Sequence, residues 1–501
     1  MTRAVRSTRW SALTLAVVLL GLALWRARCV VAGPDQDTDA YAHHMIARAI
    51  LADPRDLAVH WVWLPLFHYI QVPLVVLGGT MEFVRWTNVV LGSVPPLMLF
   101  AYVRATARTG TARIPSDAVA LAAALWAAIC PIAMQMGTTA EPEPLFAALI
   151  LAAAIAFEKR WTAATTASLA LAVMLRYEAW AALAVVAAVL AWETWRGTVR
   201  GVLAWTPVVV SVVIILSWAA LRRPVDGRWF GFLAQTREFA NGALHERSSL
   251  DHGLKGLAID LAYYPIVVPW KVIGSALPFV PFGIVRSLRQ QGARFVLVLG
   301  ACLGAITLSW IQRSSLGLDR HFVVVVPLYA TLAAQGLATV GDGAQALLRR
   351  SSISIAFGRA VFCVLGVAAL GVLAVALVRW MDIWRASVAR GWPERERLGA
   401  YLRSLPADGT IFCDDSTFEI LSGVDRGRFD RHWTDDPHTW ELIAASARQK
   451  GVAYVATWRE KFAGHENLGS VVFATGEDPS RPTTTGIAVM RVGSESTHPR
   501  H

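Results

Sequence analysis

The sequence predicts a polytopic α-helical membrane protein that ends in a small α/β domain. Of the 501 residues, 55% are hydrophobic and only 17% are charged, whereas a soluble domain averages about 25% charged residues. The mean hydropathy is +0.46. Apolar stretches approaching the roughly 20 residues of a spanning helix follow one another to about residue 380. Beyond about residue 385, short segments of helix and strand character alternate instead.

About eleven spanning helices are expected. The first lies near residues 10–30, and no small-residue cleavage site precedes Arg26, so we interpret it as an uncleaved helix rather than a signal peptide. The other ten are expected near residues 84–103, 117–136, 144–158, 162–176, 179–195, 202–221, 263–284, 294–311, 321–340 and 360–380.

Basic clusters sort to alternate loops, and this pattern predicts the orientation of the chain. They are Arg3/Arg6/Arg9, Arg104/Arg108/Arg113, Lys159/Arg160, Arg196/Arg200, Arg286/Arg289/Arg294 and Arg349/Arg350/Arg359. The positive-inside rule places these loops and the N-terminus in the cytoplasm, and everything after Trp380 outside. The net charge of +11 is therefore interpreted as a topology signal, and no nucleic-acid partner is expected.

The segment from His60 to Gly79 is apolar enough to span, but one more helix would invert every later loop. Its His and Pro residues are costly at membrane depth. We therefore expect interfacial helices there, within a first external loop of residues 33–83 and a transmembrane domain of residues 1–385.

The external α/β domain is expected at residues 386–493, followed by a frayed tail at 494–501. Helices are predicted at 393–405 and 436–451, and strands at 409–415 and 452–458. Asp414 and Asp415 follow the first strand and would either cap the next turn or form a cation site. The five cysteines show neither metal-ligand spacing nor a disulfide framework.

Four polar groups fall on the expected outer side of the membrane. The first external loop carries Asp35, Asp37 and Asp39, followed by Tyr41, His43 and His44. The other groups are Glu141 with Glu143, Arg176 with Tyr177 and Glu178, and Asp319 with Arg320 and His321. Because a proline follows each of Glu141 and Glu143, we expect both carboxylates on a short rigid turn before the fourth helix.

These residue types indicate a particular chemistry. Carboxylates suit a hard cation such as Mg²⁺ or Mn²⁺, or act without a metal as a general base. Arg176 and Arg320 suit a phosphate group, and the 21 Trp include candidates for stacking on sugars. Together they favour glycosyl transfer from a lipid-phosphate donor.

Each group also has an interpretation without catalysis. The acidic residues could lie in solvated loops, and Arg176 and Glu178 could cap a hairpin turn. Arg320 and His321 could extend from a helix end to the interface.

The order of these features resembles the glycosyltransferase C superfamily. Its members include the dolichyl-phosphate-mannose protein mannosyltransferases, the aminoarabinose transferase of lipid A and the oligosaccharyltransferase catalytic subunit. In that superfamily the first external loop carries an acidic motif followed by Tyr, to which Asp37-Thr38-Asp39-Ala40-Tyr41 is similar. The segments WLPLFHYIQVPL, RYEAW and RHFVVVVPLYATL resemble its later features, and Glu141 or Glu143 matches the acidic residue that opens its fourth helix.

The resemblance implies an inverting glycosyltransferase that uses a polyprenyl-phosphate sugar on the outer face of the membrane. The usual Asp-Glu pair is absent, so Asp37 and Asp39 both remain candidates for the general base. Arg176, Arg320 and His321 would hold the donor phosphate, and Glu141 and Glu143 would bind the acceptor or a metal. The supporting residues would be Tyr41, His43, His44, Tyr177 and Glu178.

The cofactor and the acceptor stay open at this point. Superfamily precedent divides between no metal and a Mg²⁺ or Mn²⁺ ion, which Asp37, Asp39 and Glu141 would hold here. The acceptor would be a glycan, a lipid or a protein. The abundance of Ala, Arg and Val over Lys favours a bacterial inner membrane.

Two rival hypotheses remain. One is a transporter or flippase of a lipid-linked sugar, in which charged groups line a substrate path. The other is a catalytically silent relative that binds the lipid-linked sugar. The clustering of charges on one expected side of the membrane favours the enzyme.

Overall fold

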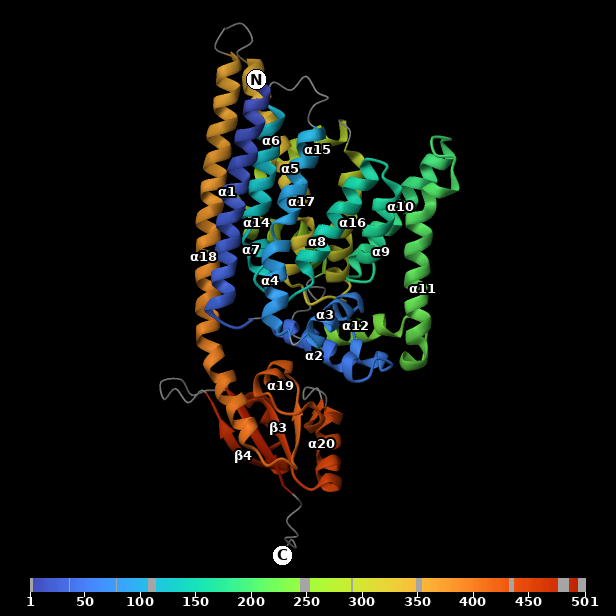
Figure 1. The fold of residues 1–501 in the computed structure, drawn as a ribbon, viewed down its shortest axis with the longest axis vertical. Helices are drawn as coiled ribbons and strands as arrows, with labels where there is room; N and C mark the ends of the chain where they lie inside the picture. Colours follow the sequence, from blue (N-terminus) through green and yellow to red (C-terminus); the bar gives the residue numbers. More distant parts are fainter. Residues whose placement is uncertain are drawn as a thin grey trace, which may run out of the picture. The chain divides into compact units, whose positions relative to one another are not determined.

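The computed structural model describes residues 3–35, 37–77, 79–106, 114–243, 253–289, 292–347, 354–431, 437–475 and 486–493. It consists of two compact units (Figure 1). The helical unit comprises Met1–Asp35 and Ile46–Met381, and the C-terminal unit comprises Gln36–Met45 and Asp382–His501. The fold is that of a polytopic α-helical membrane protein with a small C-terminal sheet, which confirms the predicted fold class.

The first half of the helical unit runs from the N-terminus to α10. Its helices are α1 (Arg3–Ala32), α2 (Thr38–Ala52, shared with the C-terminal unit), η1 (Leu57–His60), α3 (Leu66–Val76), α4 (Met81–Leu91), α5 (Val94–Thr106), α6 (Ser116–Ala128), α7 (Pro131–Met136), α8 (Glu143–Glu158), α9 (Thr162–Ala172) and α10 (Glu178–Trp195).

The second half continues to α18, whose C-terminal part enters the C-terminal unit. Its elements are η3 (Val202–Trp205), α11 (Thr206–Asp226), α12 (Gly231–Ala243), α13 (Gly253–Ala262), the π-helix η5 (Tyr263–Val267), α14 (Val268–Ile273), η6 (Leu277–Phe279), α15 (Val280–Arg289), α16 (Ala293–Ile311), η7 (Asp319–Val325), α17 (Val326–Leu347) and α18 (Ser354–Ser404).

Eight helices among the described residues are long and apolar enough to cross a membrane, so the predicted number of eleven is not confirmed. They are Arg9–Ala32, Met81–Thr106, Glu178–Trp195, Val202–Asp226, Gly253–Ile273, Ala293–Ile311, Asp319–Leu347 and Ala356–Ala386. The helices near the predicted spans 117–136, 144–158 and 162–176 are shorter: α6 has 13 residues, α8 has 16 and α9 has 11. At 1.5 Å per residue, none reaches the hydrocarbon thickness of about 30 Å.

Prolines explain two of these differences. The predicted helix 117–136 is divided because Cys130 is extended, with φ −61° and ψ 121°, immediately before Pro131; a proline disfavours the helical conformation of the preceding residue. The predicted helix 263–284 contains four prolines and becomes η5, α14, η6 and α15. The spanning helix there begins earlier, at Gly253.

Among its described residues, the apolar segment 60–79 contains no helix long enough to span a membrane. Its helix α3 has 11 residues, which at 1.5 Å each cover about half of the hydrocarbon core. His60, His68 and Gln71 are fully buried, as expected for polar groups that lie against protein.

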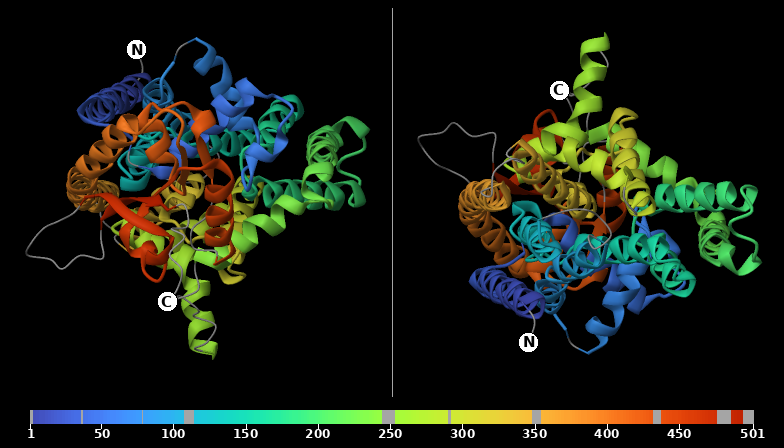
Figure 2. Two further views of the ribbon diagram at one scale, coloured as in Figure 1. Left: turned by 90° about the horizontal axis from the view of Figure 1, so that it is seen from below. Right: turned by 90° about the horizontal axis from the view of Figure 1, so that it is seen from above.

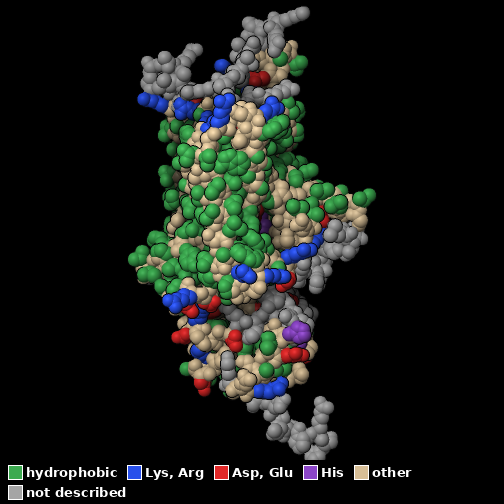
Figure 3. Space-filling model, turned by 90° about the vertical axis from the view of Figure 1, so that its right-hand side faces the viewer, with side chains coloured by type: hydrophobic (Ala, Val, Ile, Leu, Met, Phe, Trp, Pro, Cys, Tyr) green, Lys and Arg blue, Asp and Glu red, His purple; other side chains and the backbone are tan. Residues whose placement is uncertain are grey.

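Helix packing in the helical unit brings distant segments together. Helix α1 packs against α4 and α6, and α15 packs closely against α17. Seen along the helices, α9 to α11 lie at the edge away from α1 (Figure 2). On the face of this unit that Figure 3 shows, hydrophobic side chains form a broad band, with Lys and Arg at its ends. This distribution is typical of a membrane-embedded surface.

The C-terminal unit contains a five-stranded mixed sheet of order β2-β1-β3-β5-β4. Strand β1 pairs parallel with β2 and β3, while β5 pairs antiparallel with β3 and β4. The elements after α18 are β1 (Thr410–Cys413), α19 (Ser416–Ser422), η8 (Arg426–Arg428), β2 (Phe429–Arg431), α20 (Pro437–Lys450), β3 (Ala453–Trp458), η9 (Arg459–Phe462), η10 (Glu466–Leu468), β4 (Gly469–Ala474) and β5 (Ile487–Val492).

Alternation along the strands divides the core of this sheet between its two faces. Ile411 and Cys413 pack with Leu398 of α18 on one face, while Phe412 packs with Trp440 of α20 on the other, as the two-residue period of a strand requires. The four elements predicted at 393–405, 409–415, 436–451 and 452–458 are present. Strands β2, β4 and β5 were not predicted. The predicted frayed tail at 494–501 lies outside the described residues, as do Arg108, Arg113, Arg349 and Arg350.

Candidate active site

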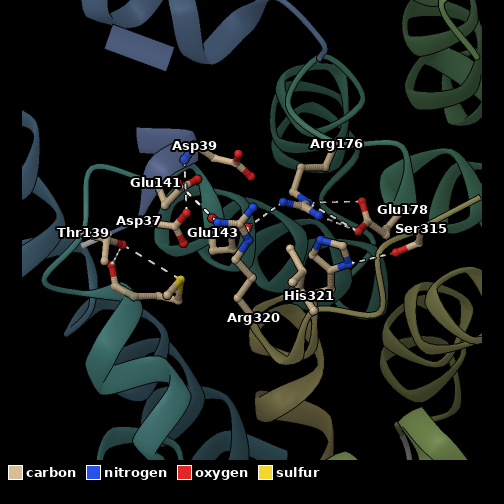
Figure 4. A network of polar contacts seen from close by, with 12 residues as sticks. Asp37, Asp39, Thr139, Glu141, Glu143, Arg176, Glu178, Ser315, Arg320 and His321 are labelled. Atoms are coloured by element: carbon tan, nitrogen blue, oxygen red, sulfur yellow. Dashed lines mark hydrogen bonds and ion pairs between the residues drawn. The ribbon is translucent and has the colours of Figure 1, made fainter. Parts of the chain in front are cut away.

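Three glutamates and two arginines of the helical unit form a continuous chain of ion pairs, which we call the ion-pair chain (Figure 4). Arg176 donates to Glu178 at 3.0 Å and to Glu143 Oε1 at 2.6 Å. Arg320 lies 3.7 Å from the same Glu143 oxygen and 3.4 Å from Glu141 Oε1. The order is therefore Glu178, Arg176, Glu143, Arg320 and Glu141, with Glu143 between the two arginines.

Two helix N-termini position the carboxylates. Glu143 is the first residue of α8, and Glu178 is the first residue of α10. A negative charge there is stabilised by the helix dipole, typically by about 0.3–1 kcal/mol. The prediction that Glu143 lies on a turn before the helix was wrong, because Pro144 falls in the first helical turn, where a missing N–H costs nothing.

The third element is η7, which leads into α17. It carries Arg320 and His321, and His321 Nδ1 lies 3.3 Å from Ser315 Oγ. Figure 4 shows the His321 ring beside Arg320 on the side that faces Ser315. Asp319 faces other partners, the Tyr263 hydroxyl at 3.2 Å and Lys271 at 3.4 Å.

Burial makes the pairing of these charges obligatory. Glu141 and Glu143 are only 1% and 2% exposed, and the Arg176 side chain is 17% exposed. Burial acts to lower the pKa of Arg176, but the charges of Glu178 and Glu143 outweigh it and raise the pKa, so Arg176 stays cationic. Removing one member would leave a buried charge uncompensated, which typically costs about 3–5 kcal/mol.

Two polar residues of α4 that were not among the predicted site residues hold the turn before Glu141. Asn88 Nδ2 donates to the carbonyls of Thr139 and Glu141, both at 2.8 Å, and Arg85 Nε donates to the Thr138 carbonyl at 2.8 Å. Both side chains are 1% exposed. They lie three residues apart on one face of α4. A polar pair at this spacing in an apolar helix was the available sequence signal.

Asp35 belongs to the same network, and its role is structural. Its Oδ2 accepts a hydrogen bond from the Ala140 N–H at 2.5 Å and lies 3.8 Å from Arg85 Nε. Arg85 also donates to the carbonyl of Gly33 at 2.7 Å. Asp35 therefore ties the end of the first helix to the turn that carries Glu141.

The other candidate residues of the first external loop, from Asp37 to His44, belong to the C-terminal unit. Asp37 immediately precedes α2, and its Oδ1 accepts from the Asp39 N–H at 3.2 Å, as an N-cap does. Tyr41, His43 and His44 are buried in α2. Within the helical unit, the structure brings Glu141, Glu143, Arg176, Glu178 and Arg320 together.

Tyr177 lies outside the ion-pair chain, although it is adjacent to Arg176 in sequence. Its hydroxyl donates to the Val62 carbonyl at 2.8 Å, and its ring packs with Trp180 and Phe232. Burial raises its pKa. It therefore anchors the first external loop to α10 and α12.

Asp414 and Asp415, which follow β1, both contact groups of the protein. Asp415 is the N-cap of α19 and accepts from the Thr417 N–H at 2.8 Å, which confirms the capping interpretation. Asp414 accepts from Thr457 and from Lys461, at 2.9 and 2.7 Å. Within the described part of the chain, no three His, Cys, Asp or Glu residues are arranged to hold a metal ion.

Comparisons with known proteins match the fold rather than the sequence. No protein-family model and no curated protein matches the chain. The crystal structure of ArnT from Cupriavidus metallidurans bound to undecaprenyl phosphate is similar, with a TM-score of 0.54 and 15% identity over 97% of this chain and 99% of that one. The apo state of ArnT gives a TM-score of 0.55 and 13% identity over 96% of this chain and 98% of that one.

A third similar structure is the archaeal oligosaccharyltransferase AglB from Archaeoglobus fulgidus, in complex with an inhibitory peptide and a dolichol-phosphate. Its TM-score is 0.49, with 12% identity over 97% of this chain and 75% of that one. The match to ArnT extends over nearly the full length of both chains. The protein therefore has the fold of the glycosyltransferase C superfamily of membrane glycosyltransferases.

Proposed function

We propose that this protein is an integral-membrane glycosyltransferase that takes a sugar from a polyprenyl-phosphate donor. The fold is shared with ArnT, one of whose structures contains undecaprenyl phosphate. The acceptor would be a glycan, a lipid or a protein on the outer face of a bacterial inner membrane, where the positive-inside rule places the C-terminal domain.

The ion-pair chain is the observation that carries this proposal. Ionisable residues buried in a membrane protein are costly and mark functional sites. Glu143 and Glu178 accept from three of the five N–H groups of Arg176, so two others can donate to a phosphate oxygen. Glu143 holds Arg176 and Arg320 near one another despite their like charge. Two neighbouring guanidinium groups are suited to bind the oxygens of one phosphate group.

The proposed reaction is a single displacement with inversion. The acceptor hydroxyl loses its proton to Asp37 or Asp39, and its oxygen forms a bond to the anomeric carbon. The bond from that carbon to the phosphate oxygen breaks, and the polyprenyl phosphate leaves with the electron pair. Arg176 and Arg320, with His321 beside them, would stabilise the charge on the departing phosphate. Glu141 and Glu143 would orient the acceptor.

A Mg²⁺ or Mn²⁺ ion would need three ligands such as Asp37, Asp39 and Glu141. The described residues do not present such a set, and no step of the proposed reaction uses a metal.

Sugar transfer and donor hydrolysis in detergent, with a panel of polyprenyl-phosphate sugars, test the proposal. Asp37→Asn, Asp39→Asn and Glu141→Gln would be compared with wild type, with and without EDTA. Loss of the general base should lower turnover about 10²-fold or more in one Asp variant. Loss of activity in EDTA, restored by Mg²⁺ or Mn²⁺, would show that a metal is required.

Two exposed carboxylates provide matched controls. Asp53 lies in the same external loop and Glu82 at the start of α4, and both are exposed; Asp53→Asn and Glu82→Gln should retain wild-type turnover. If no donor is consumed, and a lipid-linked sugar binds equally to wild type and Asp variants, the enzyme proposal is wrong. A transporter or a silent binding protein would then replace it.

A further inference from the structure

The acidic motif, residues Asp37 to Tyr41, packs with the C-terminal unit rather than with the helices that flank it in sequence. Residues Gln36–Met45 group with Asp382–His501, whereas Asp35 and Ile46 on either side belong to the helical unit. A segment of ten residues is thus held by a part of the chain more than 300 residues away. This grouping indicates a specific contact surface.

The first contact is a hydrogen bond to the start of α2. Ser416 Oγ donates to the Thr38 carbonyl at 3.2 Å. Ser416 is the first residue of α19, and the Asp415 side chain caps that helix. The donor is therefore fixed by the fold of the α/β domain, and it binds the residue that lies between the two candidate bases.

The second contact is aromatic. The rings of Tyr41 and Trp392 lie 5.8 Å apart at an interplanar angle of 31°, within the range of favourable aromatic pairs. Tyr41 is 2% exposed and Trp392 is 7% exposed. The tyrosine of the motif therefore packs against α18 of the C-terminal unit.

The Trp392 side chain is itself held by the sheet. The Arg395 guanidinium lies 6.0 Å from the Trp392 ring and 5.6 Å from the ring of Trp458, the last residue of β3. Arg395 also pairs with Asp415 at 3.7 Å. A stack of Tyr41, Trp392, Arg395 and Trp458 thus runs from the motif to the central strands, and Asp415 connects both contacts.

We propose that the C-terminal α/β domain is a positioning element for the acidic motif, which it holds through Trp392 and Ser416. The inference rests on the proposed function for its catalytic meaning, because Asp37 and Asp39 are the candidate bases there. Trp392 and Ser416 are positioning residues and touch no reacting atom. Their removal should loosen α2 and displace the carboxylates while the domain itself stays folded.

Hydrogen exchange of the full-length protein in detergent tests this without reference to activity. In Trp392→Ala and Ser416→Ala, peptides covering residues 37–45 should exchange about tenfold faster than in wild type, because local opening becomes easier. Peptides from β3 and β5 should be unchanged. Trp392→Phe keeps a ring against Tyr41 and should restore most of the protection.

Two variants elsewhere in the same domain are matched controls. Tyr401 stacks on Phe473 at 4.4 Å, and Ser404 Oγ donates to the Tyr401 carbonyl at 2.7 Å. Tyr401→Ala and Ser404→Ala thus remove the same kinds of contact away from the motif. They should leave exchange at 37–45 as in wild type.

Measurements of kcat and of KM for the lipid donor then test whether the position of the acidic motif affects catalysis. A displaced base should lower kcat about tenfold to 100-fold in Trp392→Ala, the scale expected of a misplaced group, while KM for the lipid donor stays within about twofold. Unchanged exchange at 37–45 in Trp392→Ala and Ser416→Ala would overturn the positioning role. So would a rise in donor KM at constant kcat. If wild type transfers no sugar at all, the transferase proposal fails, and exchange still decides whether the domain holds the motif.

Discussion

Glu143 shows how one side chain can organise several charges. Its Oε1 is within ion-pair distance of both Arg176 and Arg320, so two guanidinium groups that would repel one another share one anion. The sequence predicts all three residues as site candidates, in separate groups. Only their meeting in space shows that Glu143 also holds the arginines.

The Asn88 side chain offers a prediction about Glu141. Asn88→Ala removes two buried hydrogen bonds to the carbonyls of Thr139 and Glu141, and each carbonyl left unsatisfied typically costs about 1–3 kcal/mol. The thermal midpoint in detergent should fall by several degrees, and turnover should fall because the turn before Glu141 loosens. The neighbouring Thr87→Ala, which removes an exposed hydroxyl that donates to Phe83, should change neither. Equal melting of the two variants would contradict the role of Asn88.

His60 provides a prediction about pH. Burial, followed by the charge of Arg222, lowers its pKa to about 3, and its Nδ1 lies 2.8 Å from His68 Nδ1. In the unfolded chain the His60 ring becomes protonated below about pH 6.5. In the folded chain the same ring stays neutral down to about pH 3. Stability should therefore decrease as pH falls from about 6.5 toward 3, by up to about 1.4 kcal/mol per pH unit.

The variant His60→Asn removes the imidazole that titrates and keeps a polar group near His68. Thermal midpoints measured between pH 4 and 8 should decline less steeply below pH 6.5 in the variant than in wild type. Identical slopes would show that His60 is protonated in the folded protein.

At the scale of elements, proline positions and close helix approach decide the architecture. Helix α17 approaches η6 and α15 so closely that a Cβ on Gly336 would lie 1.8 Å from the carbonyl oxygen of Phe279, the last residue of η6. The reciprocal position is Gly283, whose Cβ would lie 1.7 Å from the Leu332 carbonyl oxygen. Small residues permit such backbone contact in membrane helices.

Gly336→Ala should therefore separate the two helices and lower the thermal midpoint strongly. Gly343 lies on the same helix with open space around it, so Gly343→Ala should be neutral or gain up to about 1 kcal/mol from helix propensity. The two substitutions add the same methyl group to one helix. A similar midpoint for both variants would mean that α15 and α17 are not in backbone contact.

At the scale of the whole molecule, the distribution of basic loops predicts sidedness. Glu441 on α20 is exposed, and so is Arg200 after α10. In a Cys363→Ala background, where the four remaining cysteines are buried, Glu441→Cys should react with an impermeant maleimide in intact cells. Arg200→Cys should react only after permeabilisation, and the reverse pattern would invert the orientation.

The sequence by itself determined the membrane class, the α/β character of the C-terminal end, and the residue types of the site. Hydropathy, strand alternation and charge sorting are local properties of the chain, so they can be read along it. The superfamily resemblance also rested on short local motifs, and the fold bears it out.

Tertiary structure alone decided which of these residues meet. The contacts of Arg85 and Asn88 with the 138–141 turn cross more than 50 residues, and those of Thr38 and Tyr41 with Ser416 and Trp392 cross more than 300. No local pattern specifies such partners, because they depend on helix packing and on the folding of the sheet. The number of spanning helices also depended on which prolines interrupt a helix. Packing in the folded protein decides this, so the local sequence pattern does not specify it.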